Sequence, residues 1–477
     1  MGWEALNMMS VNEPIQVVGL GIEEQEMLHE LFKIYNNHHS ANLQKNKYYE
    51  GAIKLSDVNI GIALPNGISG VGIGCSWGAK TVDVLAARSM FDGFVDENGS
   101  ELTLLDEIVK ANSLISEYGK ACRDELKFGC SFATLSADDE SGCSIRFHSP
   151  MTAAAKWDGE KGRIAYGFAI IDVKETEGCV IPILINLYTD DVIWVLRYDE
   201  PLNVWKAVGH KHKMGRPLME PLIWNSTSAK PLGRSRIKYP IRELINGYVR
   251  TVANATIGLE FATAPQKYLL GITDDQFSAV IDNKFKQYVG NILAATTNPE
   301  TGEKPTFGQL QQGTLSPHVE MIRVLATQFS AATGLPVTDT GVVNDANPTS
   351  SDAIMAQTKT LVGMAEELNA GNGESLRIIA LMAMAIAQNK KIEDLTDDEK
   401  AVVAHFKNPA MPSVAATTDA AMKIASVRNS FAETDTFLEM VGFDQADIRR
   451  IKNQEQRVRG LALIAELGNE DNTSGVE

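Results

Sequence analysis

Apolar side chains in the last third of the chain recur at helical spacing, in two stretches separated by a polar loop. Between Ser316 and Gly334 the apolar positions fall mostly three or four residues apart, which predicts an amphipathic helix. Gly334 and Pro336 predict where this helix ends. A longer helix is predicted to begin at about Ser351, because Pro348 precedes Thr, Ser and Asp residues whose side-chain oxygens can cap free backbone amides.

The loop between these two helices, residues 338–350, is rich in Asp, Asn, Thr and Gly and contains no Lys or Arg. Such a segment can bury little apolar surface, although a rigid helix is predicted on each side of it. Loops of this composition are common as ordinary surface connections. Loops held on rigid supports also commonly carry binding sites. The residues of the loop by themselves leave both interpretations open.

The preceding part of the chain predicts helices first, then strands, then helices again. Helical spacing covers these segments: Glu23–Tyr49, Thr81–Met90, Leu102–Leu126 and Ile237–Phe261. Apolar and polar residues alternate instead in these segments: Gly167–Val173, Val180–Tyr188 and Val192–Tyr198. Turns at Asp158-Gly159 and Glu177-Gly178 would join the strands into an antiparallel sheet. We therefore expect an α+β fold with a β-rich insert.

Glycine and alanine mark two features of the predicted helices. Ala370-Gly-Asn-Gly373 interrupts the long C-terminal helix, and two interior glycines cost about 2 kcal/mol of helix stability, which predicts a kink or a break. Small residues recur along the helix Ile237–Phe261 at Gly247, Ala253, Ala255 and Gly258. They would allow close approach either of helices from neighbouring subunits or of helices within one subunit.

The order of these elements resembles the portal proteins (head–tail connectors) of tailed bacteriophages, specifically the siphophage type. The resemblance extends from about residue 28 to residue 458 and depends on the order of many short marks, none of which is specific alone. In chain order the marks are Asn46-Lys-Tyr-Tyr-Glu-Gly51, Gly233-Arg-Ser235, Ala264-Pro-Gln266, Gly334-Leu-Pro336, Ser350-Ser-Asp-Ala-Ile354, Asn408-Pro-Ala-Met-Pro-Ser413 and Ala420-Ala-Met-Lys-Ile424.

The resemblance implies a portal fold with a wing, a helical stem, a clip and an α-helical crown, assembled into a ring. The implied parts are 1–235 as the N-terminal wing with the β-rich insert, 236–263 as the first stem helix, 264–315 as the clip, 316–337 as the second stem helix, 338–350 as the channel loop, 351–413 as the long wing helix and wing return, and 414–477 as the crown. A stem helix of about 20 residues would be about 30 Å long.

The implied function is that of a structural ring of about twelve subunits at one capsid vertex, through which double-stranded DNA is packaged and ejected. Partners would be other copies of the chain, the DNA, the terminase large subunit, the major capsid and scaffolding proteins, and a head-completion adaptor. The implied channel-loop residues are Thr338, Asp339, Thr340, Gly341, Val342, Val343, Asn344, Asp345, Ala346 and Asn347. The implied clip contacts with the motor and adaptor are Gln266, Lys267, Tyr268, Asp274 and Asp275.

The composition agrees with a globular virion protein that does not bind DNA tightly. The 44 Lys and Arg against 61 Asp and Glu give a net charge of −17. Tight DNA binding needs positive charge that neutralises phosphates, whereas an acidic channel would repel a moving duplex. We expect no signal peptide, membrane span or metal site, and buried cysteines rather than disulfides. The protein would be assembled in the host cytoplasm and end in the virion.

Two other functions remain as alternatives. One is a nucleotide-binding enzyme built on Gly74–Thr81, which approximates a phosphate-binding loop but has Ala79 where that motif has a second glycine. The other is a virion ring protein without a DNA channel. No catalytic residue, cofactor or metal ligand is assigned. His210 and His212 would share a strand face, but two further metal ligands are missing.

A cluster of basic residues near the C-terminus has two interpretations. The residues are Arg449, Arg450, Lys452, Arg457 and Arg459, with acidic residues between them. They would either meet packaged DNA or form a solvated helix face that is paired with neighbouring groups.

Overall fold

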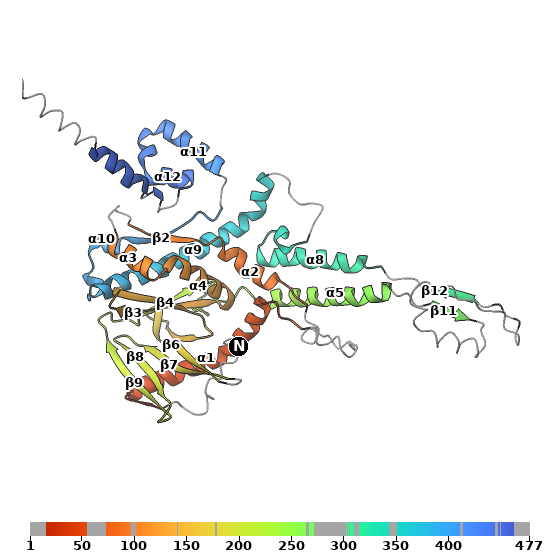
Figure 1. Ribbon diagram of the computed structural model, residues 1–477, viewed down its shortest axis with the longest axis horizontal. Coiled ribbons are helices and arrows are strands. Elements are labelled where there is room, and N and C mark those ends of the chain that lie inside the picture. The colour runs from red at the N-terminus through yellow and green to blue at the C-terminus, as the bar shows by residue number, and fades with distance from the viewer. Residues whose placement is uncertain are drawn as a thin grey trace, which may run out of the picture. The chain divides into compact units, whose positions relative to one another are not determined.

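The computed structural model shows a mixed α+β protein (Figure 1). It describes residues 16–54, 73–96, 102–140, 142–176, 179–263, 267–270, 302, 304, 306–309, 314–342, 351–410, 414–443, 447–448 and 450–461. The chain divides into two compact units. The first unit contains Met1–Leu43, Asp83–Arg236 and Met355–Glu477, and the second contains Gln44–Val82 and Ile237–Ile354.

The largest element of the first unit is a six-stranded sheet with the order β1-β9-β8-β7-β6-β5. Its strands are β1 (Val17–Val18), β5 (Ala153–Asp158), β6 (Arg163–Thr176), β7 (Cys179–Tyr188), β8 (Val192–Asp199) and β9 (Val204–Lys211). All neighbours are antiparallel except β1 and β9. Helix α1 (Ile22–Tyr49) contributes Leu28, Leu31 and Tyr35 to a core shared with Phe168 and Trp205 of the sheet. The predicted antiparallel sheet is therefore confirmed; Glu177-Gly178 lies outside the described residues.

A smaller sheet in the same unit has the order β10-β3-β4. The remaining elements of this unit are helical or form a two-stranded ladder between β2 and β13. Their bounds are β2 (Phe91–Asp96), α3 (Thr103–Ala111), α4 (Leu114–Phe128), β3 (Cys130–Asp138), β4 (Gly142–His148), β10 (Met219–Ile223), η4 (Ile392–Asp394), α10 (Asp397–Lys400), β13 (Val402–Phe406), α11 (Val414–Val427), η5 (Asn429–Glu433) and α12 (Asp435–Val441). Helix α9 (Ser351–Ala387) contributes most of its length to this unit.

The segment Leu102–Leu126, predicted to be helical, forms two separate helices, α3 and α4. Ser113 between them has a φ of 50°. The Asn112 side chain donates to the Cys143 carbonyl at 2.8 Å and accepts from the Ile145 amide at 2.8 Å. These hydrogen bonds between the Asn112 side chain and β4 therefore stabilise the chain where α3 ends.

A kink or a break was predicted at Ala370–Gly373; the break is wrong, since α9 is continuous through these residues. Asn372 is fully buried, and so are Leu368 and Leu376 on either side. A Cβ atom at Gly373 would lie 3.6 Å from the Phe406 ring. Packing along this part of α9 outweighs the low helix propensity of two glycines.

Gly233 of the Gly-Arg-Ser mark lies close to the end of α4 at Gly129. Gly129 ends α4 with a φ of 116°, and Gly233 has a φ of 73°. A Cβ atom at Gly233 would lie 2.4 Å from the carbonyl oxygens of both Gly129 and Trp224. Two backbone segments pass so closely here that Gly233 has no room for a side chain, and the positive φ of Gly129 favours glycine there.

The second unit is dominated by two helices, α5 (Tyr239–Thr263) and α8 (Ser316–Thr333). Between them along the chain, β11 (Lys267–Leu270) pairs in antiparallel register with β12 (Thr306–Gln309) (Figure 1). The unit also contains the start of α2 (Trp77–Ala86) and the short 3₁₀ helix η3 (Val337–Thr340). The helix ends predicted for α8 are confirmed, and Gly334 caps it with a φ of 71°.

The described basic residues near the C-terminus do not form one stripe; Arg449 lies outside the described residues. At 100° per residue, positions 450 and 457 fall on one side of the helix at 450–461, and positions 452 and 459 fall on the opposite side. Arg450 pairs with Asp447 at 3.3 Å, and Lys452 pairs with Asp435 of α12 at 2.6 Å. These contacts favour the interpretation of a paired, solvated helix.

Candidate functional site

The first candidate site is the pair of helices α5 and α8 with the segments that they carry. The helices are antiparallel, because Gly247 faces Leu325 whereas Gly258, further along α5, faces Leu315 just before α8. A Cβ atom at Gly247 would lie 3.2 Å from the Leu325 side chain. The small residues therefore serve, at these two positions, the close packing of helices within one subunit.

Trp77 at the start of α2 closes one end of this helix pair. The side chain is 3 % exposed. The Trp77 ring lies 4.8 Å from the ring of Phe329 of α8, in a stacked arrangement, and 4.6 Å from the ring of Tyr248 of α5. One aromatic side chain thus holds three helices of the second unit together. Sequence reasoning missed this residue, although a tryptophan inside a glycine-rich segment is an available signal for buried packing.

Trp77 also fixes the start of the predicted channel loop. Its Nε1–H donates to the carbonyl oxygen of Thr340 at 3.2 Å. Thr340 is buried, and its hydroxyl donates to the Val337 carbonyl at 2.6 Å. Gly341 then turns the chain with a φ of 77°.

Five of the ten predicted loop residues lie in the described part of the chain. Thr338, Asp339 and Thr340 belong to the ordered turn η3, whereas a loop was predicted there. Gly341 and Val342 follow the turn. The other five lie outside the described residues: Val343, Asn344, Asp345, Ala346 and Asn347.

The predicted clip residues also fall into two groups. Lys267 and Tyr268 lie in β11, opposite Gln309 and Gly308 of β12. Gln266, Asp274 and Asp275 lie outside the described residues. The role of these residues stays a prediction.

The segment Gly74–Thr81 does not adopt the geometry of a phosphate-binding loop. A Cβ atom at Gly78 would lie 2.0 Å from the Tyr48 carbonyl oxygen, so another backbone segment covers the start of α2. The Thr81 hydroxyl, which would bind a metal in that motif, is buried and donates to the Trp77 carbonyl at 2.8 Å. This arrangement gives no support to the nucleotide-binding alternative.

Apolar side chains remain exposed on α8. Val319, Met321 and Val324 are 48 %, 46 % and 49 % exposed, respectively. Met321 and Val324 are three residues apart and therefore lie on the same side of the helix. The seam with α5, through Leu325 and Phe329, borders this side, since Leu325 lies one turn after Met321. Met321 and Val324 therefore form an exposed apolar area beside the seam.

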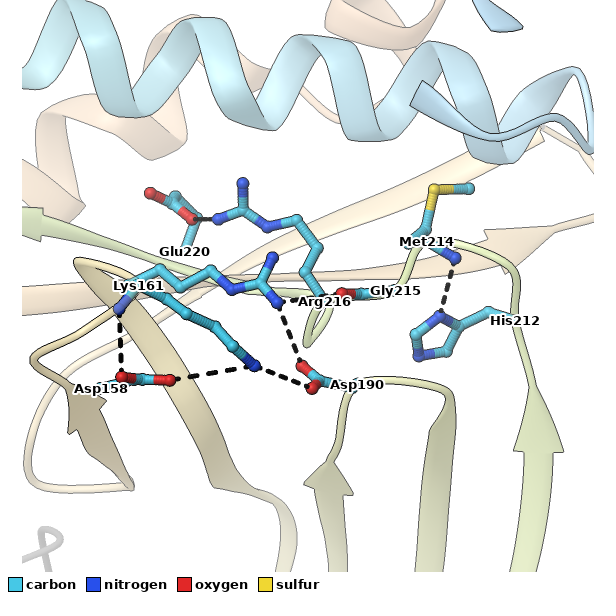
Figure 2. A network of polar contacts seen from close by, with 9 residues as sticks. Asp158, Lys161, Asp190, His212, Met214, Gly215, Arg216 and Glu220 are labelled. Atoms are coloured by element: carbon cyan, nitrogen blue, oxygen red, sulfur yellow. Dashed lines mark hydrogen bonds and ion pairs between the residues drawn. The ribbon is translucent and has the colours of Figure 1, made fainter. Parts of the chain in front are cut away.

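A second candidate site is a network of charged groups in the first unit (Figure 2). Three turns or loops meet there: the β5–β6 turn with Asp158 and Lys161, the β7–β8 turn with Asp190, and the segment before β10 with Arg216. Lys161 lies 3.9 Å from Asp158 and 3.8 Å from Asp190. Their pairing ties turns of the large sheet together.

Arg163 and Arg216 extend this network toward the smaller sheet. Arg163 lies 3.6 Å from Asp190 and donates to the Gly215 carbonyl at 3.0 Å. Arg216 is paired with Glu220 of β10, and their side chains are only 14 % and 9 % exposed. Burial raises the pKa of Glu220 to about 7 although Arg216 opposes that shift, and burial also lowers the pKa of Arg216. Burial therefore outweighs mutual attraction for both groups, which is typical of a structural ion pair rather than a stabilising one.

The histidines near this network do not form a metal site. His212 accepts a hydrogen bond at Nδ1 from the Met214 amide at 3.4 Å, and burial lowers its pKa. His210, on β9, is exposed. Among the described residues no group of three or more His, Cys, Asp or Glu side chains is placed to hold a metal ion. Cys75, Cys122, Cys130 and Cys143 are buried free thiols, as predicted. No helix in the described part of the chain is long and apolar enough to cross a bilayer.

Comparisons with known proteins give matches to solved structures only. Neither a family model nor a curated protein matches the chain. A chain of a structure described as "Neck of native GTA particle computed with C12 symmetry" matches with a TM-score of 0.45 and 10 % identity, over 77 % of this chain and 89 % of that chain. A chain of "Virion of native gene transfer agent (GTA) particle" matches with a TM-score of 0.43 and 10 % identity, over 73 % and 84 %. We therefore draw the function from the residues of the chain itself.

Proposed function

We propose that this protein is a structural subunit of a phage-type virion, and specifically a portal protein. Copies would form a ring at one capsid vertex through which double-stranded DNA passes. The ring would dock the terminase during packaging and a head-completion adaptor afterwards. The protein would supply a channel and docking surfaces rather than catalysis.

The observation that carries this proposal is the construction of the second unit. Helices α5 and α8 pack closely through Gly247 and leave an apolar side of α8 exposed. One end of the pair carries the β11–β12 ladder, where the resemblance places the clip. The other end carries the turn that Trp77 fixes, where the resemblance places the start of the channel loop.

Exposed apolar side chains on α8 fit contact with the next copy in a ring. A ring of identical subunits needs two different surfaces on each copy, and a helix pair can offer one on each side. Burying Met321 and Val324 removes apolar area from water and favours association. The net charge of −17 supports a channel that does not retain DNA by its phosphates.

Replacing both Met321 and Val324 by Glu is expected to abolish ring formation, because two charges would have to be buried at the contact. Negative-stain electron microscopy with parallel mass measurement tests this on the purified protein. The wild-type chain is expected to form rings of about twelve subunits around a hole wide enough for a duplex. Leu202→Glu, at an exposed leucine in the turn between β8 and β9, is the matched control and should assemble normally.

Two results would count against this proposal. Rings that form equally well with both glutamates would show that this side of α8 is not a subunit contact. Wild-type rings without a central hole would favour a virion ring protein that has no DNA channel.

Removal of residues 343–347 is expected to leave ring formation intact but to prevent packaging or retention of DNA. The deletion spares Thr340, whose carbonyl binds Trp77, so the helix pair should keep its closed end. DNA protected from nuclease inside heads is the quantity to measure. A variant with the same five residues in reverse order controls for composition. Normal amounts of protected DNA in the deletion variant would remove the channel-loop assignment.

A further inference from the structure

Four polar side chains form a buried cluster in the first unit that the proposed function does not use. They are Ser89, Tyr118, Glu125 and Asn372, each no more than 3 % exposed. Tyr118 and Glu125 project from α4, and Asn372 comes from α9, more than 240 residues later in the chain. Phe91 and Phe406 flank the Tyr118 ring at 5.7 and 5.8 Å. The cluster is therefore a group of buried polar side chains that lies in an otherwise apolar core.

Asn372 is the centre of the hydrogen bonds in this cluster. Its Nδ2 group donates to the Tyr118 hydroxyl at 3.0 Å and to Glu125 Oε2 at 2.8 Å. Tyr118 and Ser89 share a further hydrogen bond at 2.7 Å. Sliding or rotating α9 by one residue would remove Asn372 from both acceptors and leave an amide and a carboxyl group buried without these partners. Such a change is costly, so the cluster defines one register of α9 on α4.

Among the residues that the structure describes, no basic side chain is paired with Glu125. The titratable groups that face it are Tyr118 and Cys122, from the same helix, and neither carries positive charge. From α9, the neutral Asn372 amide donates to it. A carboxylate in this environment would be charged, buried and unpaired, which is the most expensive state for such a group.

We propose that the Glu125–Asn372 contact is a proton-dependent lock that holds α9 in register on α4 while Glu125 is protonated. Loss of the proton would place an uncompensated charge at the contact and favour separation of the two helices. The lock belongs to the subunit fold and does not require the ring proposed above. The stability of the contact between α9 and α4 would therefore depend on pH.

The expected pH window follows from the burial of Glu125. Burial raises the pKa of this carboxyl group from 4.5 to about 8, with the Asn372 hydrogen bond acting in the opposite direction. Below pH 4.5 the group is protonated whether the helices are together or apart. Between about 4.5 and about 8 only the separated state releases the proton, so stability falls as pH rises, and above about 8 the dependence levels off.

Hydrogen exchange followed by mass spectrometry on the intact protein tests this inference. Peptides from α4 and α9 should lose protection about tenfold per pH unit between pH 5.5 and 7.5, after correction for intrinsic exchange rates. Glu125→Gln should lack that slope, because a glutamine has no proton to release in this range. Glu117→Gln, on an exposed part of the same helix, should keep it.

Two outcomes would overturn the proposal. One is protection of the wild-type α4 and α9 peptides that stays constant over this pH range. The other is an unchanged slope in Glu125→Gln, which would assign the proton to another group. Constant protection in the wild type overturns the proposal even if Glu125→Gln does not fold. Because ring formation is not part of the readout, failure here leaves the portal proposal untouched.

Discussion

Trp77→Ala is expected to destabilise the second unit by about 3–5 kcal/mol, the usual range for removing a buried tryptophan side chain. The ring contacts Tyr248 and Phe329 from two helices, and its N–H satisfies the carbonyl of Thr340. The substitution would leave a cavity between α2, α5 and α8 and release the turn η3. Thermal unfolding at a fixed protein concentration and exchange of the amides at 337–342 would measure the two effects.

Trp77→Phe separates packing from hydrogen bonding at this position. A phenylalanine keeps an aromatic ring between Tyr248 and Phe329 but cannot donate to Thr340. We expect a loss of about 1 kcal/mol for the missing hydrogen bond, together with faster exchange in the turn. Equal destabilisation by Phe and Ala would show that the hydrogen bond, and not the ring, holds this end of the helix pair.

Arg216→Ala is expected to destabilise the first unit by about 3–5 kcal/mol at pH 8, because it leaves the Glu220 carboxyl group buried without its partner. Burial already raises the pKa of Glu220 to about 7. Without Arg216 this pKa should rise further, so the stability of the variant should fall with pH over a wider range than that of the wild type. Thermal unfolding from pH 5 to 8 measures the difference, which should be smallest at pH 5.

Replacing both partners distinguishes a costly single deletion from a stabilising ion pair. Arg216→Met combined with Glu220→Leu should be nearly neutral or stabilising, because burial disfavours both charges more than their pairing compensates. Lys174→Ala is the matched control in an exposed pair, with Lys174 and Glu200 2.6 Å apart and each 52 % exposed. That control should change stability by less than about 1 kcal/mol. A double variant as unstable as Arg216→Ala would show that the ion pair itself stabilises the fold.

Most of the long helices and the strands β6, β7 and β8 could be predicted from the sequence, because their apolar spacing is strong. Gly334 both predicts and makes the end of α8, since glycine readily adopts the positive φ required there. The alternating segments of the β-rich insert became β6, β7 and β8, because one face of that sheet is buried against α1. The errors arose where distant contacts override local preference. Asn112 ends a helix because β4 binds its side chain, and α9 continues through two glycines because Asn372 has partners on α4.

The candidate site was predictable in its order along the chain but not in its contacts. The sequence indicated the order of two helices, the segment between them and a polar loop. It also indicated a protein too acidic to bind DNA tightly. Only the tertiary structure decided that Trp77 fixes the loop's first turn, that small residues on α5 serve packing within the subunit, and that Glu125 meets Asn372. Local spacing determines which face of an element is apolar. Which distant element covers that face depends on the whole fold, because such contacts join residues that share no local pattern.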